Sequence, residues 1–421
     1  QFMEIYRMKK SLLAVAATTA FAGAAQAQSS VTVYGIIDMG YVGTTAATKT
    51  LAGVETKTTT NSFKSGSEST SRLGFKGNED LGGGSSAFFT VEMALNPDSA
   101  SLTGASTAKY GYEYNSNKAG SAVDNRQSFV GLKKNGVGEF SLGRQYTLNY
   151  EMQAATSATG NTIMPGNVLY PVSGAAGSGV DSDSAMTLRA SNSLIARTAT
   201  FAGFRGNAMY AMSNTNKTDT GAVNTGTQNW SGWGLSADYT WQKLYLGVAY
   251  QSFKTQYANG VASSADQINA GLTPTQITSV AAGTTAVFPA TMLSDKQTLV
   301  TGTYDFGILK AFAGWSGRKV QDDYTGVAAA GAQINRNAQA IGVRSYLTPT
   351  IEAWGTVGNG RVKATVASTY ANFTGWQVGS NYYLSKRTNL YAIYGSQTTT
   401  SNNVNGAASN AAYALGVRHT F

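Results

Sequence analysis

Apolar and polar residues alternate one by one along much of this chain. In the segment 413–421, Tyr413, Leu415, Val417, His419 and Phe421 fall on one face, and the residues between them are small or polar. A period of two is the pattern of a β-strand, whose successive side chains point to opposite faces. Similar segments of about ten residues recur from position 31 onward, which predicts an all-β protein.

The last residue lies inside such a strand. Chain ends normally fray into solvent, so an apolar last residue in register needs a partner on both sides. The segment 30–42 has the same alternation, with Asp38 on its polar face, and can supply that partner. Pairing of the first strand with the last closes the sheet and leaves no free edge.

The connections between these segments come in two sizes that alternate along the chain. Seven short clusters typical of tight turns begin at positions 78, 133, 203, 240, 305, 346 and 384. Eight long stretches rich in Thr, Ser, Asn, Gly and Ala lie at 43–66, 96–122, 148–187, 214–230, 255–293, 320–334, 361–371 and 399–409. These fifteen connections predict a transmembrane 16-stranded antiparallel β-barrel with short periplasmic turns and long extracellular loops. A β-sandwich, the alternative, gives no reason to sort its connections by length.

The beginning of the sequence predicts export. After a natural start at Met8, two lysines precede an apolar run that ends near Ala25, and a small residue follows at Ala27. The run is shorter than the roughly 20 residues of a transmembrane helix, which favours a cleaved secretory signal peptide. We therefore expect a signal peptide with upstream residues in 1–27 and a single barrel domain in 28–421.

Composition excludes several kinds of site. The 421 residues include 48 Gly, 23 Tyr and 16 Phe, but no Cys and one His. Thiolate and two-histidine metal sites are therefore excluded, and His419 lies on the outward parity, where it cannot act as a catalytic base. We expect no metal, no cofactor and no enzymatic activity. The formal net charge of +9 comes from singly scattered basic residues, which argues against nucleic acid as a partner.

Four stretches resemble a known family. They are 71–92, 125–147, "YYLSKRTNLYAIYG" at 382–395 and the terminal "GVRHTF". They are similar to the Gram-negative general porins, most closely the betaproteobacterial branch, over essentially the whole chain after residue 27. The resemblance implies an outer-membrane homotrimer, each barrel narrowed by an infolded third loop, that passes small hydrophilic solutes and ions by diffusion.

The resemblance also implies partners and an assembly signal. The expected partners are membrane lipid, lipopolysaccharide and the barrel-assembly machinery. Phe421, with His419 and Tyr413, is similar to the terminal signal that this machinery recognises. The alternatives are a substrate-specific channel, which would more often have eighteen strands and a ladder of lumenal aromatics, and an adhesin whose loops carry the function.

Strand parity sorts the charged residues between lipid and lumen. Leu73 and Phe75 are expected to face lipid, so Arg72 faces the lumen. Phe129 is expected to face lipid, so Arg126 also faces inward. Arg144 shares parity with apolar outward residues, so we exclude it from the pore and expect a subunit contact.

The segment 187–201 supplies two more lumenal arginines, Arg189 and Arg197. The residues expected to face outward are Leu188, Asn192, Leu194 and Ala196, and Ile195 fits this parity poorly. Asp38 and Glu92 are the wall carboxylates that can pair with lumenal arginines.

The third loop, about 148–187, departs from the enterobacterial pattern of Pro-Glu-Phe-Gly. Here Pro165 and Gly166 are followed by no acid, and the expected tip, 164–170, is uncharged. The acids Glu151, Asp181 and Asp183 lie near the loop's roots. An arginine-lined wall that faces a neutral loop predicts a preference for anions.

Overall fold

The computed structural model describes residues 30–99, 102, 125–170, 187–215, 228–257, 291–322, 333–365, 370–402 and 406–421. The predicted signal peptide lies outside these residues, so its cleavage after Ala27 stays a prediction. Among the described residues, no helix is long and apolar enough to cross a membrane.

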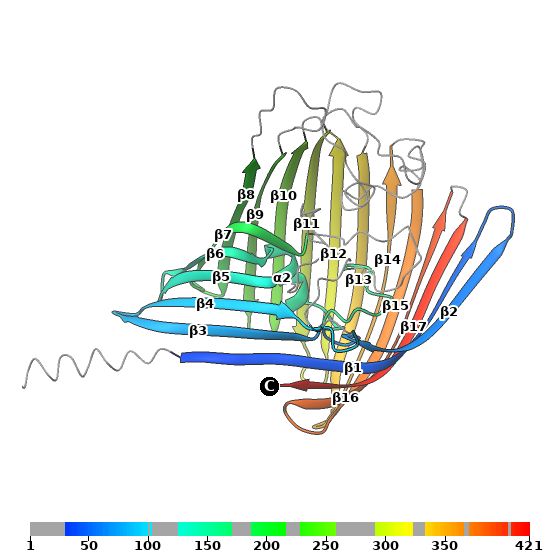
Figure 1. Ribbon diagram of the computed structural model, residues 1–421, viewed down its shortest axis with the longest axis horizontal. Helices are drawn as coiled ribbons and strands as arrows, with labels where there is room; N and C mark the ends of the chain where they lie inside the picture. The colour runs from blue at the N-terminus through cyan, green and yellow to red at the C-terminus, as the bar shows by residue number, and fades with distance from the viewer. Residues whose placement is uncertain are drawn as a thin grey trace, which may run out of the picture.

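The described residues form one antiparallel sheet that closes on itself (Figure 1). Its strands are β1 (Ser30–Lys49), β2 (Glu55–Ser65), β3 (Arg72–Gly82), β4 (Ser85–Ala94), β5 (Asn125–Lys134), β6 (Gly138–Tyr146), β7 (Arg189–Thr198), β8 (Phe204–Thr215), β9 (Gln228–Trp241), β10 (Leu244–Tyr257), β11 (Thr291–Asp305), β12 (Lys310–Asp322), β13 (Gln333–Thr348), β14 (Ile351–Ala364), β15 (Tyr370–Tyr383), β16 (Thr388–Ser401) and β17 (Ala407–Thr420). Each strand from β3 to β16 pairs with the next in sequence, β1 pairs with β17, and β2 and β3 both pair with β1.

Two of these strands share one position in the barrel. The upper part of β1, 39–49, pairs with β2, and the lower part, 30–36, pairs with β3. The segment 66–71 between β2 and β3 interrupts what is otherwise one strand. The prediction of a closed 16-stranded antiparallel barrel is therefore confirmed.

Most of the first predicted loop, 43–66, is strand. The predicted bounds of this loop are therefore wrong. It forms a hairpin in which β1 pairs with β2 up to Lys49 and Glu55. The polar composition of this stretch predicts a loop. The stretch is also rich in threonine, however, and threonine is a β-branched residue that favours strands. Thr44 and Thr60 hydrogen-bond across the pair at 2.5 Å.

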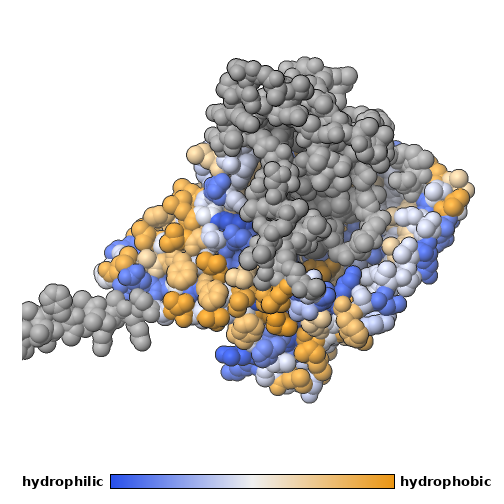
Figure 2. Space-filling view, viewed as in Figure 1, coloured by the Kyte–Doolittle hydropathy of each residue, from blue (hydrophilic) through white to orange (hydrophobic). Residues whose placement is uncertain are grey.

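Side chains alternate between the two faces as the sequence predicts for the last strand. Tyr413, Leu415 and Val417 are exposed on the outer face, whereas Ala412 and Ala414 are buried on the inner one. Figure 2 shows apolar residues gathered over the lower part of the molecule. This apolar outer face is the surface that a transmembrane barrel offers to lipid.

The seam of the barrel joins the two ends of the described chain. The amide of Gly35 donates to the carbonyl of Phe421 at 3.0 Å, and the amide of Phe421 donates back at 3.1 Å. A Cβ on Gly35 would collide with the Phe421 ring, so the ring packs on a position that only glycine leaves open. His419 is exposed on the outer parity, where its Nδ1 hydrogen-bonds the Thr388 hydroxyl at 2.9 Å.

The barrel wall has two heights (Figure 1). The strands β3 to β7, here called the low wall, have 9 to 11 residues each. The strands β9 to β17, here called the tall wall, have 13 to 16. Every strand of the tall wall is longer than the 9–11 residues or so that a bilayer requires, and no strand of the low wall is.

The third loop folds into the barrel. It begins with the helix α2 (Leu148–Ala155), whose first turn is capped by the Thr147 hydroxyl. The segment 156–170 then runs along the inner face of the tall wall, where a Cβ on Gly342 or Gly358 would collide with it. Arg336 Nη2 donates to the carbonyl of Val168 at 2.6 Å. The predicted infolding is present in the described part of the loop.

Candidate pore constriction

Three arginines gather on the inner face of the low wall, and two of them pair with a single carboxylate. Arg126 Nε lies 2.7 Å from Glu92 Oε1, and Arg72 Nη1 lies 4.0 Å from the same oxygen. The Tyr34 hydroxyl donates to Glu92 Oε2 at 3.1 Å. We call Arg72, Arg126 and Arg189 the arginine cluster; with Glu92 it contains three positive groups and one negative group.

Arg189 joins the cluster through Tyr146. Its guanidinium lies 4.9 Å from the centre of the Tyr146 ring, and Arg126 Nη2 donates to the Tyr146 hydroxyl at 2.7 Å. The Tyr146 hydroxyl also lies 3.5 Å from Arg189 Nη2. Arg189 Nε is buried without a hydrogen-bond partner, and no described carboxylate pairs with this arginine. Arg189 is therefore the uncompensated charge of the cluster.

A second tyrosine extends the cluster toward the third loop. Tyr150 of α2 lies 4.6 Å from Tyr146, ring centre to ring centre. Burial raises the pKa of the Tyr150 hydroxyl above its ordinary value, and the neighbouring Tyr146 adds to this effect. Because Tyr150 stays protonated at neutral pH, the loop brings no negative charge to the arginines here.

The expected orientation of Phe129 is wrong. Val130 and Leu132 are the exposed apolar residues of this strand, and the centre of the Phe129 ring lies 6.3 Å from that of Phe88 on the inner face. The register between β4 and β5 shifts beside Glu92, so that Arg126 is skipped in the pairing. This β-bulge reverses the alternation and brings Arg126 to Glu92, an effect that parity alone does not detect.

The residues around Arg189 also depart from the prediction. Leu188 does not face outward: it is buried with Ala249 and Leu299. Asn192 and Leu194 are exposed, and a register shift near Asn192, which has φ 50°, separates them from Arg189. Ile195, the poor fit, points inward and belongs to a buried cluster with Leu148 of α2, which explains why the inner face of β7 carries an apolar residue.

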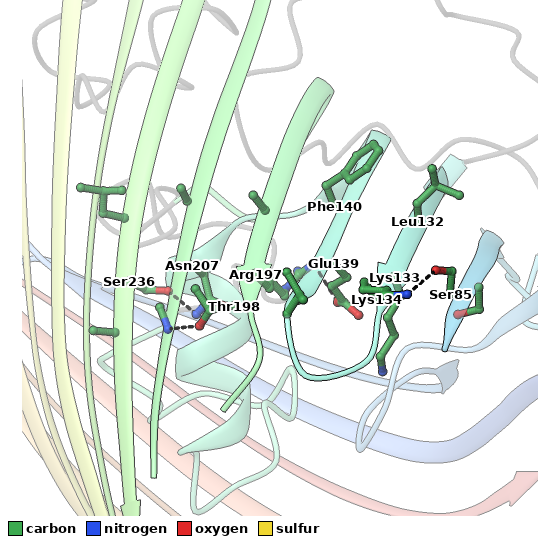
Figure 3. Close-up of a pocket in the computed structure, with 18 of the residues that line it drawn as sticks. Ser85, Leu132, Lys133, Lys134, Glu139, Phe140, Arg197, Thr198, Asn207 and Ser236 are labelled. Atoms are coloured by element: carbon green, nitrogen blue, oxygen red, sulfur yellow. Dashed lines mark hydrogen bonds and ion pairs between the residues drawn. The ribbon is translucent and has the colours of Figure 1, made fainter. Parts of the chain in front are cut away.

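Arg197 lies apart from the cluster and is neutralised. Its Nη2 binds Glu151 of α2 at 2.7 Å, and its Nη1 lies 3.7 Å from Glu139 on the neighbouring strand. Figure 3 shows Arg197 beside Glu139 at a groove of about 930 Å³. Because two carboxylates balance its charge, Arg197 is not counted with the three clustered arginines.

Asp38 does not compensate the arginine cluster either. Its side chain is fully buried and accepts hydrogen bonds from the amides of Glu68 and Ser69 at 2.9 and 2.6 Å. The Tyr391 hydroxyl donates to its other oxygen at 2.7 Å. Asp38 thus fixes the segment 66–71 inside the barrel, a structural task that the sequence did not indicate.

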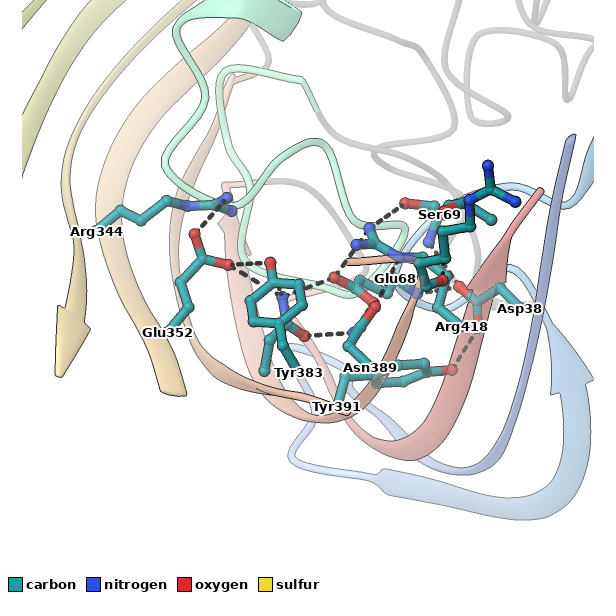
Figure 4. A network of polar contacts seen from close by, with 12 residues as sticks. Asp38, Glu68, Ser69, Arg344, Glu352, Tyr383, Asn389, Tyr391 and Arg418 are labelled. Carbon is teal, nitrogen blue, oxygen red and sulfur yellow. Dashed lines mark hydrogen bonds and ion pairs between the residues drawn. The ribbon is translucent and has the colours of Figure 1, made fainter. Parts of the chain in front are cut away.

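The inner face of the tall wall carries a polar network that the sequence analysis missed (Figure 4). Arg344 binds Glu352 at 3.2 Å, and Arg418 binds Glu68 at 3.2 Å. The amide of Asn381 connects the two carboxylates, with distances of 2.9 Å to Glu68 and 3.1 Å to Glu352. Parity could have found both arginines, because each follows an outward-facing valine, Val343 or Val417.

In the main lumenal pairs, the carboxylate lies deeper than the arginine. The side-chain exposures are 22% for Arg72 against 5% for Glu92, 27% for Arg344 against 3% for Glu352, and 21% for Arg418 against 7% for Glu68. The pair of Arg197 with Glu151 is reversed, with 17% and 37%. Water in the lumen therefore meets mostly guanidinium groups, because the acids stand behind them.

Between α2 and Tyr170, the described part of the third loop adds no charge. The segment 156–170 contains no Asp, Glu, Lys or Arg. It is held to the tall wall by polar groups, including a 2.7 Å hydrogen bond from the Thr162 hydroxyl to Gln377. Asp181 and Asp183 lie outside the described residues. Within the described part, three or more potential metal-binding side chains never come together.

Arg144 lies on the outer face of the low wall. It pairs in register with Ser128, on the same face as exposed Val130 and Leu142. Its guanidinium donates to the carbonyl of Asn125 at 2.7 Å and to the hydroxyl of Ser191 at 3.0 Å. This position on the outer face agrees with the prediction that Arg144 does not line the pore.

Comparisons with known proteins agree on one family. Residues 13–403 match the sequence model of a family described as Gram-negative porin. An outer membrane porin protein of Bordetella pertussis is 28% identical over 446 residues, covering 98% of this chain and all of the relative. Outer membrane porin protein 32 of Delftia acidovorans is 34% identical over 212 residues, 48% of this chain and 50% of that protein.

A solved structure shares the fold. The anion-selective porin from Comamonas acidovorans superimposes with a TM-score of 0.61 at 21% identity, covering 94% of this chain and all of that one. At this identity the likeness concerns the fold.

Proposed function

The chain belongs to the Gram-negative porin family, and we propose that its pore prefers anions because of the arginine cluster. As a porin it is an outer-membrane channel for the passive diffusion of small hydrophilic solutes and ions, not an enzyme. The observation that carries the proposal is that Arg72 and Arg126 share one carboxylate, Glu92, while Arg189 joins them through Tyr146 with no described carboxylate of its own.

The electrostatics support this selectivity. Like charges that line one wall of a water-filled constriction add their potentials and concentrate counterions there. The segment 156–170 of the third loop offers no acid to cancel this potential, and the one acid of α2, Glu151, is paired with Arg197. Glu352 of the tall wall and Glu68 of the segment 66–71 are buried behind Arg344 and Arg418. A fold neighbour is itself an anion-selective porin, which agrees with the proposal.

The experiment replaces the three clustered arginines with glutamine and measures the zero-current potential in a salt gradient across a planar bilayer. We expect the wild-type pore to prefer anions and the triple variant to shift toward cations. The shift is largest in dilute salt, because the Debye length falls from about 30 Å at 0.01 M to about 10 Å at 0.1 M. A wild-type pore that prefers cations in dilute salt would refute the proposal.

A substrate-specific channel and an adhesin remain the competing functions. Liposome swelling with sugars of increasing size separates them, because a general pore admits solutes by size and an adhesin admits none. A specific channel would instead admit one sugar far faster than another of equal size.

The outer face of the low wall supports the proposal of an oligomer. Arg144 lies six residues beyond Gly138 on β6, a rise of about 15 Å on a tilted strand, which places it inside the hydrocarbon layer. A charge at that depth is costly against lipid but acceptable against protein. This supports a homotrimer in which neighbouring subunits cover the low wall.

Export and assembly complete the proposal. The mature chain would begin at Gln28, and Phe421, with His419 and Tyr413, would be the terminal signal for the barrel-assembly machinery. N-terminal sequencing of the membrane form tests the first point, and the seam variants described below test the second.

A further inference from the structure

The outer face of the tall wall changes character toward the loop end. Its lower part is apolar, with Val300, Ile341 and Val357 exposed. Higher up, the register sets Lys296 directly opposite Lys319, and Lys319 opposite Asn335. Asn335 in turn faces Lys363. The four residues lie on one level across β11 to β14, and we call the three basic ones the lysine row.

The height of the lysine row matches a membrane boundary. Lys296 lies eight residues above Tyr304, which is exposed near the turn end of β11. Eight residues on a strand tilted by about 40° rise roughly 21 Å, and an apolar band of a barrel is about 25 Å tall. A lysine ammonium extends a few ångströms farther. The row therefore lies where the outer leaflet's headgroups begin.

The lysine row carries charge that the protein does not balance. Like charges directly opposite each other on a sheet are destabilising. No described side chain forms an ion pair with Lys296, Lys319 or Lys363. The nearby acid Asp295 points inward, is fully buried and binds Arg318 at 2.9 Å. An anion from outside the chain would remove this repulsion.

A polar groove of about 420 Å³ lies directly below the row. Its outward lining consists of Trp315, Asn337, Gln339, Asn359, Arg361, Asn372 and Thr374. Gln339 Nε2 donates to Asn359 at 3.0 Å, and Arg361 Nε donates to Asn372 at 2.5 Å. The Arg361 guanidinium also lies 5.1 Å from the Tyr370 ring centre. Amides, one guanidinium and one indole are unusual on a surface that meets lipid.

These groups match one class of ligand. Arginine and lysine bind phosphate, the former through paired N–H donors. Side-chain amides both donate to and accept from sugar hydroxyls. The exposed face of Trp315 offers an apolar platform for the C–H face of a sugar ring. The exposed valines and Ile341 below the groove suit acyl chains.

We infer that the lysine row and this groove bind the phosphorylated sugar headgroup of an outer-leaflet glycolipid. The phosphates lie between Arg361 and the lysines, the sugar hydroxyls contact the amides, and the acyl chains follow the apolar rows toward the turn end. The inference deepens the expected contact with lipopolysaccharide. It rests on the outer-membrane location and not on the ion selectivity of the pore.

The test compares two triple variants of the purified, detergent-solubilised oligomer. K296Q/K319Q/K363Q removes the row, and K133Q/K243Q/K386Q removes the same charge from three exposed lysines at the turn end. Each is titrated with diphosphorylated lipid A and with its enzymatically dephosphorylated form, and bound lipid per barrel is counted by native mass spectrometry. Zero-current potentials are recorded in parallel, so that a failure of this inference is distinguishable from a failure of the proposed selectivity.

We expect the lysine-row variant to bind diphosphorylated lipid A about 10- to 100-fold more weakly and the turn-end variant to bind it like the wild type. R361Q alone should have a smaller effect in the same direction. Dephosphorylated lipid should bind all forms equally weakly. Equal binding of diphosphorylated lipid by wild type and lysine-row variant would overturn the inference. Dissociation of the oligomer by the lysine-row variant, with lipid binding unchanged, would also overturn it and assign this face to a subunit contact.

Discussion

The low wall and the tall wall are both built from antiparallel strands, but they differ in strand length and in the side chains on their outer faces. The low wall, with strands of 9 to 11 residues, carries Arg144 on its outer face within the depth of the membrane. The tall wall, with strands of 13 to 16, has an apolar band on the lower part of its outer face, where Val300, Ile341 and Val357 are exposed. A short wall with an outward charge suits contact with protein, and a long wall with an apolar band suits contact with lipid.

Their inner faces differ in the same systematic way. The tall wall receives the third loop and pairs its arginines with buried acids such as Glu352 and Asp295. The low wall leaves Arg189 without a carboxylate partner among the described residues and gives Arg72 and Arg126 one acid to share. We therefore propose that the tall wall holds the third loop in place and that the low wall supplies the positive potential of the constriction.

The largest effect is expected at the seam, where the tall wall meets β1. A valine at Gly35 would collide with the Phe421 ring and with the carbonyl of Arg72, and removing Phe421 deletes two backbone hydrogen bonds of the closure. Both G35V and deletion of Phe421 should strongly reduce the amount of folded, heat-modifiable barrel in the outer membrane. Quantitative immunoblotting of unheated membrane samples measures it.

G355A is the matched control for the seam variants. An added Cβ at Gly355 meets only ordinary contacts, with Val378 as the nearest neighbour. This variant should accumulate like the wild type. If G35V accumulated equally well, the packing of Phe421 on Gly35 would not matter for closure.

The second effect tests the support given by the tall wall. Arg318 and Asp295 form a pair whose side chains are 7% and 0% exposed. R318Q leaves a buried carboxylate without its partner, so it should lower the free energy of unfolding by about 3–5 kcal/mol. Urea titration of the barrel in detergent, followed by tryptophan fluorescence, checks this. R205Q is the milder comparison: Asp238 is also buried, at 8%, but Arg205 is 44% exposed, so water can replace its guanidinium and the loss of stability should be smaller than in R318Q.

The third effect concerns the outer face of the low wall. R144E places a negative charge where we propose a subunit contact, and it should lower the fraction of trimer in mild detergent while leaving the barrel folded. Size-exclusion chromatography with light scattering gives the mass of the assembly. R387E changes an exposed arginine in a periplasmic turn and should leave the trimer intact. Unchanged trimer in R144E would place the interface elsewhere.

Much of the barrel could be predicted because its signals are local. The alternation in 413–421 and the sorting of turns from loops follow directly from strand geometry and need no tertiary information. The first hairpin was missed because its outward face is polar at a height where a barrel extends beyond lipid. A threonine-rich loop and a threonine-rich strand have similar composition there.

The site was less predictable because its geometry depends on irregularities and distant contacts. The bulge beside Glu92 inverts parity at Arg126, and a bulge leaves no signature in alternation. The roles of Asp38 and Glu68 depend on partners more than 300 positions away, namely Tyr391 and Asn389. Strand parity could place individual arginines in the lumen, but it could not show which of them pair with a carboxylate.

The central claim, that uncompensated arginine charge on the low wall sets ion preference, is tested most directly by comparing R189Q with R197Q. Both variants remove one lumenal guanidinium from the same strand, β7. Arg189 has no carboxylate partner in the described chain, whereas Arg197 is bound by Glu151 and Glu139. The measurement is the zero-current potential in a gradient of dilute potassium chloride. The account predicts an anion-preferring wild type, a clear shift toward cations in R189Q and a smaller one in R197Q. Equal shifts, or no shift in R189Q, would contradict it.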